Sequence, residues 1–530
     1  MARPKPSVLP VRRPTWLAPA VLVLLALAVY ANTLSNGFIG DDKIQLLKNP
    51  LLADLGNVPQ LLRSSVWSIL GIPGNYYRPF QFLIYMLIYQ CAGFSAAAFH
   101  WYMVLVHSLN TLLLYLLVRR MGGARFAFAA AALFAVHPIH TETVNWIAAV
   151  PDLTVTALAV AGVLWFARHD GSPHAIRITG HCGIYLLALL TKETGIVLLP
   201  LYAGYGFLCL GRRWKEFRYN AALYGAMAAT FAFYLAMRWN SLGGLAPGQQ
   251  SFYHLRPVEF ALSAAVTAAK YLGALLWPAD LNYFHIFHPT QSVDASFLVS
   301  ALALAAVAIA FFRVRLPLVS YGIFWIAVTL APAMNLTGVG QNVFAERYLY
   351  LPSAGFCWIA ALALTRLAER QPTPAWIAAG VILLAAVTAT IARNTDWRDD
   401  FTLLQVTLRQ SPASGWLHNS MAGAYVERNQ FDAALMQERL AVRYEPRSPV
   451  FHRNFGNILL AKDPHEAIPE FRNLVSLEPD RAENHCDLAL ALEAVGQPAQ
   501  AAAEYRRALQ LQPQQRDAQA GYLRTASAVR

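Results

Sequence analysis

Long apolar runs recur along the first 394 residues and predict membrane helices. A bilayer is crossed by a helix of roughly 17 to 25 mostly apolar residues. A shorter run, 79–92, follows Arg78-Pro79 and predicts an interfacial helix in the first external loop. The pattern therefore predicts an all-α, polytopic membrane domain over 1–394, with its spans among the runs 16–34, 99–118, 125–141, 150–167, 178–191, 193–210, 219–237, 258–277, 295–312, 316–334, 346–365 and 375–393.

The basic residues between these runs predict the orientation of the chain, because Lys and Arg concentrate in short cytoplasmic loops. If the N-terminus is cytoplasmic, three runs separate the basic loops at 212–218 and 313–315, and only an even number can cross. Run 258–277 contains Lys270 near its middle, and a charged residue there is costly in lipid. We expect that run to be an external or re-entrant helix, which leaves eleven spans. The basic sets are Arg3/Lys5/Arg12/Arg13, Arg119/Arg120/Arg125, Arg168/Arg177, Arg212/Arg213/Lys215/Arg218, Arg313/Arg315 and Arg366/Arg370.

The composition also indicates a membrane protein, and it affects how the positive net charge is interpreted. The 530 residues are 56% hydrophobic and 14% charged, whereas soluble domains have about 25% charged residues. A net charge of +12 would point to nucleic acid in a soluble protein. Here the basic residues lie in loops between apolar runs, so they report topology, and no nucleic-acid partner is expected.

From about residue 395 the chain becomes polar and repetitive. Prolines recur at Pro412, Pro446, Pro479 and Pro513, at intervals of 34, 33 and 34 residues, which is the period of tetratricopeptide (TPR) repeats. Each such repeat is a helix pair that buries its apolar face only against its neighbours. We therefore expect a C-terminal α-solenoid of about three TPR repeats over 395–530, of the kind that holds a peptide or protein in a groove.

Two adjacent carboxylates follow the first predicted span. They end the stretch 36–42, which lies where the first helix meets water. Side by side, Asp41 and Asp42 repel each other, so one pKa should rise unless a cation or hydrogen-bond donors share the site. An Asn-Gly and Asp-Asp cluster is also ordinary turn chemistry, and both interpretations stay open at this point.

Other polar residues gather on the same predicted external face. Ionisable groups at the ends of membrane helices cost least when they are paired or face a wet cavity. Several such clusters on one face predict an external cavity with acids, imidazoles and fixed cations. Its candidate substrate-binding residues are Arg78 in the first external loop, His137, His140 and Glu142 at the end of the third span, Lys192 and Glu193 where the fifth and sixth spans meet, and Glu346, Arg347 and Tyr350 at the start of the eleventh.

Such a cavity suits a sugar donor whose leaving group is a lipid-linked phosphate. Arg347 or Lys192 would neutralise the phosphate as charge develops on it, and an aspartate would accept the proton of an attacking hydroxyl as a general base. His137 and His140 could be metal ligands, since they have His-x-x-His spacing. With a proline between them and no third ligand evident, hydrogen-bonding roles are favoured, and a divalent cation stays an open alternative.

These segments, in this order, resemble the transmembrane and tetratricopeptide repeat-containing (TMTC) protein O-mannosyltransferases and their bacterial relatives. The resemblance covers nearly the whole chain. It implies the GT-C class of polytopic, inverting transferases, which use a polyprenyl- or dolichyl-phosphate sugar at the extracytoplasmic face, and it implies that Asp41 or Asp42 is the base for a Ser or Thr hydroxyl. The matching stretches are 36–42, 77–79, 100–110, 137–142, 192–195 and 345–357, followed by the TPR units.

The chain departs from this family in two places. Val150-Pro151-Asp152 stands where the animal members typically have Gly-Arg-Ala-Asp or Gly-Arg-Ala-Glu, so a basic group is missing there. The TPR array, with about three units, is also shorter than in the animal members. The identity of the sugar and the choice of acceptor therefore stay open.

Three functional hypotheses follow. The first is transfer of mannose or another hexose from a polyprenyl phosphate to Ser or Thr hydroxyls of extracytoplasmic proteins, in a bacterial inner membrane, with an acceptor protein or peptide held by the TPR domain. The second keeps the fold and donor but modifies an envelope glycan or lipid. The third is a membrane-anchored TPR scaffold without catalysis. The acids, the histidines and Arg347 count against the scaffold, which has no use for them.

Overall fold

The chain folds into two compact units that consist of helices. The computed structural model describes residues 16–68, 71, 74–169, 174–212, 215–245, 252–338, 340 and 342–528, and within these residues it contains no strand. One unit spans Met1–Asp399 and the other Asp400–Arg530; we call them the membrane unit and the repeat unit. The all-α prediction is confirmed for the described residues. The predicted basic residues Arg3, Lys5, Arg12, Arg13 and Arg213 lie outside them.

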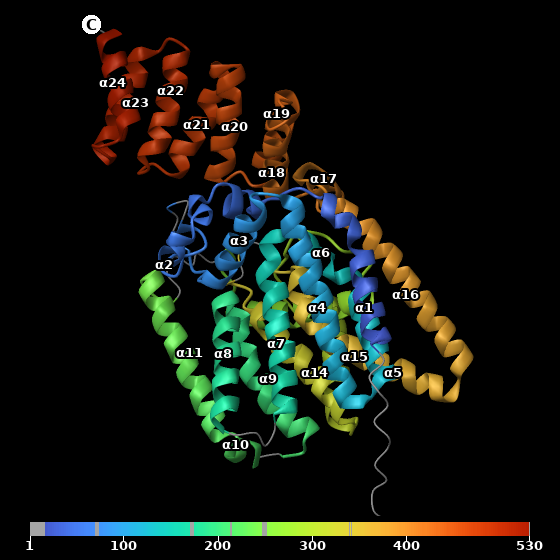
Figure 1. Cartoon of the computed structure of the whole chain (residues 1–530). Helices are drawn as coiled ribbons and strands as arrows, with labels where there is room; N and C mark the ends of the chain where they lie inside the picture. The colour runs from blue at the N-terminus through green and yellow to red at the C-terminus, as the bar shows by residue number, and fades with distance from the viewer. Residues whose placement is uncertain are drawn as a thin grey trace, which may run out of the picture. The chain divides into compact units, whose positions relative to one another are not determined.

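The membrane unit consists of α-helices joined by 3-10 and π turns and by loops (Figure 1). The α-helices are α1 (Leu17–Val29), α2 (Val58–Leu61), α3 (Pro79–Ala92), α4 (Ala96–Gly122), α5 (Ala124–Val136), α6 (Thr141–Asn145), α7 (Val150–Arg168), α8 (His174–Thr191), α9 (Leu198–Gly204), α10 (Lys215–Tyr219), α11 (Ala221–Leu242), α12 (Pro257–Leu276), α13 (Ala295–Arg313), α14 (Pro317–Leu330), α15 (Tyr350–Arg370) and α16 (Pro372–Asn394). The 3-10 and π turns are η1 (Ala31–Ser35), η2 (Lys43–Leu47), η3 (Pro50–Ala53), η4 (Leu55–Asn57), η6 (Pro138–His140), η7 (Ile147–Ala149), η8 (Glu193–Val197), η9 (Tyr205–Cys209), η10 (Ala331–Met334), η11 (Glu346–Leu349) and η12 (Thr395–Trp397).

Many of the predicted apolar runs form helices that could cross a membrane. Among the described residues, seven stretches are long and apolar enough by length and composition. They are Ala96–Gly122, Ile147–Arg168, Pro257–Leu276, Ala295–Arg313, Pro317–Met334, Glu346–Arg370 and Pro372–Trp397. Shorter apolar helices include Leu17–Val29, Ala124–Val136, Ala175–Thr191 and Glu193–Cys209. The chain is therefore a multi-pass membrane protein, and the count of eleven spans stays a prediction.

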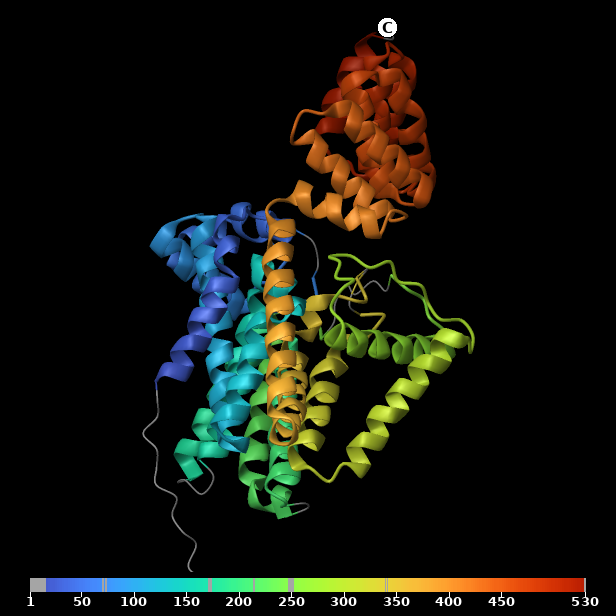
Figure 2. The ribbon, with the colours of Figure 1, turned by 90° about the vertical axis from the view of Figure 1, so that its right-hand side faces the viewer.

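Helix α12 differs from the other long helices in its direction. Figure 2 shows α12 lying across the long axis of the helix bundle, whereas α16 runs along it. By length and composition α12 could cross a membrane. The expectation of an external or re-entrant helix at 258–277, which the position of Lys270 suggested, stays a prediction.

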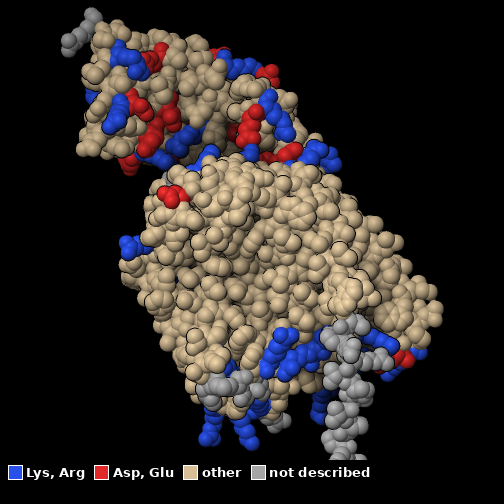
Figure 3. All heavy atoms as spheres, in the orientation of Figure 1, with Lys and Arg blue, Asp and Glu red and all other residues tan. Residues whose placement is uncertain are grey.

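Charged residues are unevenly distributed over the membrane unit. On the face shown in Figure 3, its sides are nearly free of charge, and Lys and Arg gather at the end where α10 lies. Figure 1 shows α2 and α3 at the opposite end of the same unit. The two ends of the bundle therefore differ in charge, as expected for two sides of a membrane.

The sequence places two helix ends that later shape the site. The predicted run 125–141 stops as an α-helix at Val136, and η6 begins at Pro138, where the proline ring cannot continue an α-helix. The second of these ends is the start of α15, which packs closely against α14. A Cβ on Gly355 of α15 would lie only 2.9 Å from the carbonyl oxygen of Gly322 in α14, so glycine permits this close approach. Trp325 of α14 also donates from Nε1 to the carbonyl oxygen of Leu351 at 2.9 Å. This contact fixes the start of α15, next to η11.

The repeat unit is a succession of helices with a recurrent hydrogen bond. Near the start of the first helix of each pair, a side chain contacts the carbonyl oxygen of the proline six residues earlier. The contacts are His418–Pro412, His452–Pro446 and His485–Pro479, each 2.9 Å, and Gln519–Pro513, 2.8 Å. They recur at the proline period of the sequence. The helices are α17 (Asp400–Gln410), α18 (Gly415–Val426), α19 (Phe431–Tyr444), α20 (Pro449–Lys462), α21 (Pro464–Leu477), α22 (Ala482–Ala494), α23 (Pro498–Leu511) and α24 (Arg516–Ala528).

Candidate active site

A charged cavity lies in the membrane unit. Its volume is about 360 Å³, within the range of roughly 300–1,000 Å³ that small-molecule sites occupy. It is bordered by residues of the loop after α1, of η7 and the start of α7, of η8, α11 and η10, and of η11. Ionisable groups are costly in an apolar membrane domain unless they are paired or face a wet cavity, so such a cluster marks a candidate functional site. The charged residues that border it are Asp41, Arg78, Asp152, Lys192, Glu193, Arg238 and Arg347.

Asp42 is held by backbone amides and does not border the cavity. Its Oδ2 accepts a hydrogen bond from the N–H of Ile39 at 3.1 Å, and its Oδ1 accepts one from the N–H of Ala148 at 2.6 Å. The residue is 1% exposed. The first contact closes the local turn and the second ties that turn to η7. The turn interpretation of the acidic pair therefore describes Asp42.

Asp41 faces different surroundings. It borders the cavity, and Gly40 before it has φ +51°, a backbone conformation that glycine adopts without strain. Among the described residues, no hydrogen bond or ion pair engages the Asp41 carboxylate. Burial raises its pKa, and the nearby Arg347 guanidinium offsets part of that rise. A carboxylate with a raised pKa at a cavity wall has the properties of a general base.

Three cations of the cavity are paired with acids. The Nζ of Lys192 lies 2.5 Å from Oδ1 of Asp152. Glu193 contacts two arginines: its Oε2 accepts from Nη2 of Arg78 at 2.9 Å, and its Oε1 lies 3.4 Å from Nη1 of Arg238. Arg238 also donates to the backbone carbonyl oxygen of Asn75. These contacts fix the cations in place around the cavity.

The fourth cation, Arg347, is held from behind by Glu142. The Nη1 of Arg347 lies 2.5 Å from Oε1 of Glu142, and its backbone N–H donates to Oε2 at 3.0 Å. Its guanidinium carbon lies 5.0 Å from the ring centroid of Trp146 and 4.8 Å from that of Tyr348. Glu142 is fully buried and does not border the cavity, so it orients Arg347 toward it.

The charges around the cavity balance only when Asp41 is ionised. Four cations border it, and three acids other than Asp41 contact them. With Asp41 ionised, four positive charges face four negative ones; with Asp41 protonated, one positive charge is in excess. In that protonated state the site favours an added anion. The cations are Arg78, Lys192, Arg238 and Arg347, and the acids that contact them are Glu142, Asp152 and Glu193.

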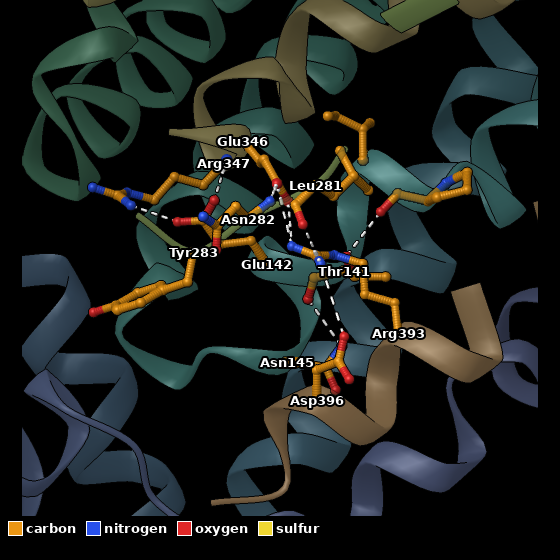
Figure 4. A network of polar contacts seen from close by, with 12 residues as sticks. Thr141, Glu142, Asn145, Leu281, Asn282, Tyr283, Glu346, Arg347, Arg393 and Asp396 are labelled. Carbon is orange, nitrogen blue, oxygen red and sulfur yellow. Dashed lines mark hydrogen bonds and ion pairs between the residues drawn. The ribbon is translucent and has the colours of Figure 1, made fainter. Parts of the chain in front are cut away.

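A second network lies behind Arg347 (Figure 4). Glu346, the chain neighbour of Arg347, is fully buried. Its Oε1 and Oε2 accept hydrogen bonds from Nη2 of Arg393 at 3.2 and 3.0 Å, and Oε1 also accepts from the backbone N–H of Asn282. Arg393 lies in the last turn of α16. The network therefore joins η11 to the end of the last helix of the membrane unit.

The structure places the other predicted residues away from the cavity. His137 Nε2 contacts the carbonyl oxygen of Leu275 at 3.1 Å, and His140 Nε2 contacts Oγ of Ser353 at 2.7 Å. The hydroxyl of Tyr350 contacts Nδ1 of the buried His107 at 2.7 Å. Among the described residues, no group of three His, Cys, Asp or Glu side chains is arranged to hold a metal ion. Substrate contacts of these residues stay a prediction.

Sequence reasoning missed three residues of the site. Arg238 and Asp152 border the cavity, and Arg393 binds Glu346, the chain neighbour of Arg347. Arg238 and Arg393 stand at the ends of apolar runs, and that position was the available signal. Asp152 was noted only as a departure from a family pattern, although its neighbour in space is Lys192.

The described fold and site define a multi-pass membrane protein with a charged cavity. No protein-family model matches the chain. Its sequence is similar to Protein O-mannosyl-transferase TMTC3 of Mus musculus, 25% identical over 480 residues, which cover 82% of this chain and 52% of the relative. It is also similar to Protein O-mannosyl-transferase Tmtc1 of Drosophila melanogaster, 26% identical over 535 residues, which cover 81% of this chain and 62% of the relative.

The resemblance to the TMTC proteins is therefore confirmed at the level of sequence similarity. It spans 52% and 60% of the length of the mouse and human TMTC3 proteins that it matches. A solved structure of ArnT from Cupriavidus metallidurans bound to undecaprenyl phosphate is 14% identical and covers 93% of this chain and 80% of that one. Its TM-score of 0.41 is too low to establish a shared fold.

Proposed function

We propose that the chain is a GT-C-type glycosyltransferase. It transfers a hexose, with mannose suggested by the names of its relatives, from a polyprenyl-phosphate donor to Ser or Thr hydroxyls of extracytoplasmic proteins. The observation that carries the proposal is the position of Asp41, a carboxylate at the wall of a cavity with four cations. Similarity to proteins named as O-mannosyltransferases supports the reaction class.

The reaction would be a single displacement at the anomeric carbon of the sugar. The acceptor hydroxyl oxygen attacks C1, the bond between C1 and the phosphate oxygen breaks, and its electron pair stays on the phosphate. Asp41 takes the hydroxyl proton as general base. The phosphate changes from a diester monoanion to a monoester dianion. Because the oxygen attacks opposite the leaving group, the configuration at C1 is inverted.

The charges of the cavity suit this transfer. As Asp41 gains a proton, the phosphate gains a negative charge, so the total charge within the cavity is unchanged while the charge moves toward the cations. Arg347 is the candidate for the leaving phosphate, since its planar guanidinium can donate two parallel hydrogen bonds. Lys192 is the second candidate, as a compact point charge. Fixed cations of this kind stabilise charge that develops in the transition state.

The same proposal includes an orientation in the membrane. Lys and Arg gather at the α10 end of the unit, whereas α2 and α3 lie at the other end (Figures 1 and 3). We place the α10 end in the cytoplasm, on the positive-inside rule, and the cavity at the outer face of a bacterial inner membrane, with eleven spans. The repeat unit is then extracytoplasmic, where a TPR solenoid would hold the acceptor polypeptide.

A direct experiment tests the proposed reaction. The full chain in nanodiscs is incubated with a short-chain polyprenyl-phosphate mannose and a Ser/Thr peptide library, and the peptides are analysed by mass spectrometry. We expect a hexose mass increment on Ser or Thr that depends on the protein. Matched donors with glucose or galactose identify the sugar. Absence of any donor consumption, with correctly folded protein, would contradict the proposal.

The glycan or lipid acceptor is the second hypothesis and can be separated from the first. A chain that ends at residue 399 lacks the repeat unit. If the acceptor is a polypeptide held by the repeats, this chain should lose transfer to protein and keep slow transfer to a small hydroxyl compound. Equal transfer to envelope lipid by both chains would favour the second hypothesis. The scaffold hypothesis is not favoured, because the relatives are named as transferases.

A further inference from the structure

We propose that Arg393 is a positioning residue for Arg347. This inference rests on the proposed function, since it concerns the guanidinium assigned to the leaving phosphate. Arg393 does not border the cavity. It stands in the last turn of α16, and its side chain is 13% exposed, so its charge is largely removed from water.

All three nitrogens of the Arg393 guanidinium contact other residues. Its Nη2 donates to both carboxylate oxygens of Glu346, at 3.2 and 3.0 Å. Its Nη1 donates to the carbonyl oxygen of Leu281 at 2.7 Å, and its Nε donates to Oγ1 of Thr141 at 3.0 Å. Nη1 also lies 3.8 Å from Oδ2 of Asp396. Three segments distant in sequence therefore meet on one side chain, as Figure 4 shows.

These contacts link η11 to α6 twice, and we call the pair of links the frame. Glu346 and Arg347 are neighbours in η11, and Thr141 and Glu142 are neighbours in α6. Arg347 binds Glu142 directly, while Arg393 bridges Glu346 to Thr141. Two adjacent residues on one segment are thus bound to two adjacent residues on the other. The direction of the Arg347 side chain depends on both links.

The chemistry of the frame calls for arginine at this position. Glu346 is fully buried, and a buried carboxylate left without a counter-charge is strongly destabilising. Lysine could supply the charge, but it lacks the planar fork with which arginine reaches partners on several sides at once. A lysine at 393 should therefore neutralise Glu346 and lose part of the bridge to Thr141 and Leu281.

The inference predicts a specific pattern of kinetics. Displacement of a catalytic group by about 1 Å can cost on the order of 10²-fold in rate. We expect Arg393→Gln to lower kcat by about that factor with a smaller change in the KM for the donor, because the phosphate still finds the other cations. Arg393→Lys should recover part of the lost kcat. Arg398→Gln is the matched control, since Arg398 follows closely in the chain and its side chain is 68% exposed.

The experiment uses the full chain in nanodiscs and separates positioning from folding. The double variant Glu346→Gln/Arg393→Gln removes the buried charge together with its partner, so it should fold and still show the reduced kcat. Hydrogen exchange of the backbone amides at 346–349 is measured in parallel, without substrate, and should rise in the Arg393 variants and stay unchanged in Arg398→Gln. Unchanged kcat per folded molecule together with unchanged exchange would overturn the inference. If the wild-type chain transfers no sugar, the proposed function fails, and the exchange measurement still decides whether Arg393 holds η11.

Discussion

The Oδ1 of Asp42 accepts a hydrogen bond from the backbone N–H of Ala148 at 2.6 Å. This contact joins the loop after α1 to η7, next to the first turn of α7. It also engages Asp42, so that the neighbouring Asp41 is the member of the pair that borders the cavity. Two acids that are adjacent in sequence thereby differ in their surroundings: Asp42 holds the loop, and Asp41 borders the cavity.

Replacement of Asp42 should act through stability. Asp42→Asn keeps one carbonyl acceptor and loses the charge-assisted contact to a second backbone amide, and the net loss is expected to be about 1–3 kcal/mol. Thermal unfolding of the detergent-solubilised chain measures it. Asp41→Asn, which breaks no hydrogen bond in the described structure, is the matched control and should unfold at the wild-type temperature. Equal unfolding temperatures for wild type and Asp42→Asn would contradict the assignment.

The pH dependence of transfer should report the surroundings of Asp41. Burial raises the pKa of Asp41 above its ordinary value of 3.8. The base acts only when ionised, so the rate is present above that raised pKa and falls as the pH drops through it. A pH profile of kcat/KM measures the acid limb. A limb at the ordinary value of a carboxyl would show that Asp41 is either solvated or not the base.

Arg347 should change both the height and the position of that profile. Arg347→Gln removes a positive charge that lowers the pKa of Asp41, so the acid limb should shift to higher pH. The same change removes a donor to the leaving phosphate and should lower the plateau rate by about 10²–10³-fold, the cost of losing one oxyanion donor elsewhere. Arg347→Lys retains the charge, so its limb should stay near the wild-type position. An unshifted limb in Arg347→Gln would argue that the two residues do not share a site.

The positions of the helices could be predicted from the sequence, but the side-chain pairs between distant segments could not. Apolar runs predicted the spans because hydrophobic length alone decides whether a helix can cross a bilayer, and Pro138 marked the end of α5. Ion pairs between distant segments could not be predicted in this way, because they depend on how the helices pack. Arg393 and Glu346 are 47 residues apart and meet because α16 and η11 both pack against η6 and α6. The ion pair of Glu142 with Arg347 joins residues 205 positions apart and could not be predicted from the sequence either.

The repeat unit should be less stable at alkaline pH through His452. Its Nε2 faces the carbonyl oxygen of Pro446, and its Nδ1 lies 2.7 Å from Oε2 of Glu470. Both partners accept, so the ring binds them best when it carries two protons, and the contact with Glu470 raises the pKa of His452. A raised histidine pKa gives stability that is full below the unfolded value and is lost as the pH rises through the folded one.

The first repeat offers the control for this prediction. His418 makes the same proline contact, but its Nδ1 faces the uncharged amide of Gln437 at 2.7 Å. Glu470→Gln converts the second repeat to that arrangement and should remove the pH dependence of protection in α20 and α21. Hydrogen exchange of the full chain, corrected for the intrinsic effect of pH, measures it. A dependence that persists in Glu470→Gln would assign it to another group.

The most direct test of the account is the initial rate of hexose transfer by Asp41→Asn, compared with wild type under saturating donor. The acceptor peptide is the best substrate from the library, and donor binding is measured on the same preparation. If Asp41 is the general base, Asp41→Asn folds, binds the donor, and transfers more slowly by roughly 10²–10⁴-fold, the contribution of a general base. Transfer at the wild-type rate by Asp41→Asn would contradict this assignment.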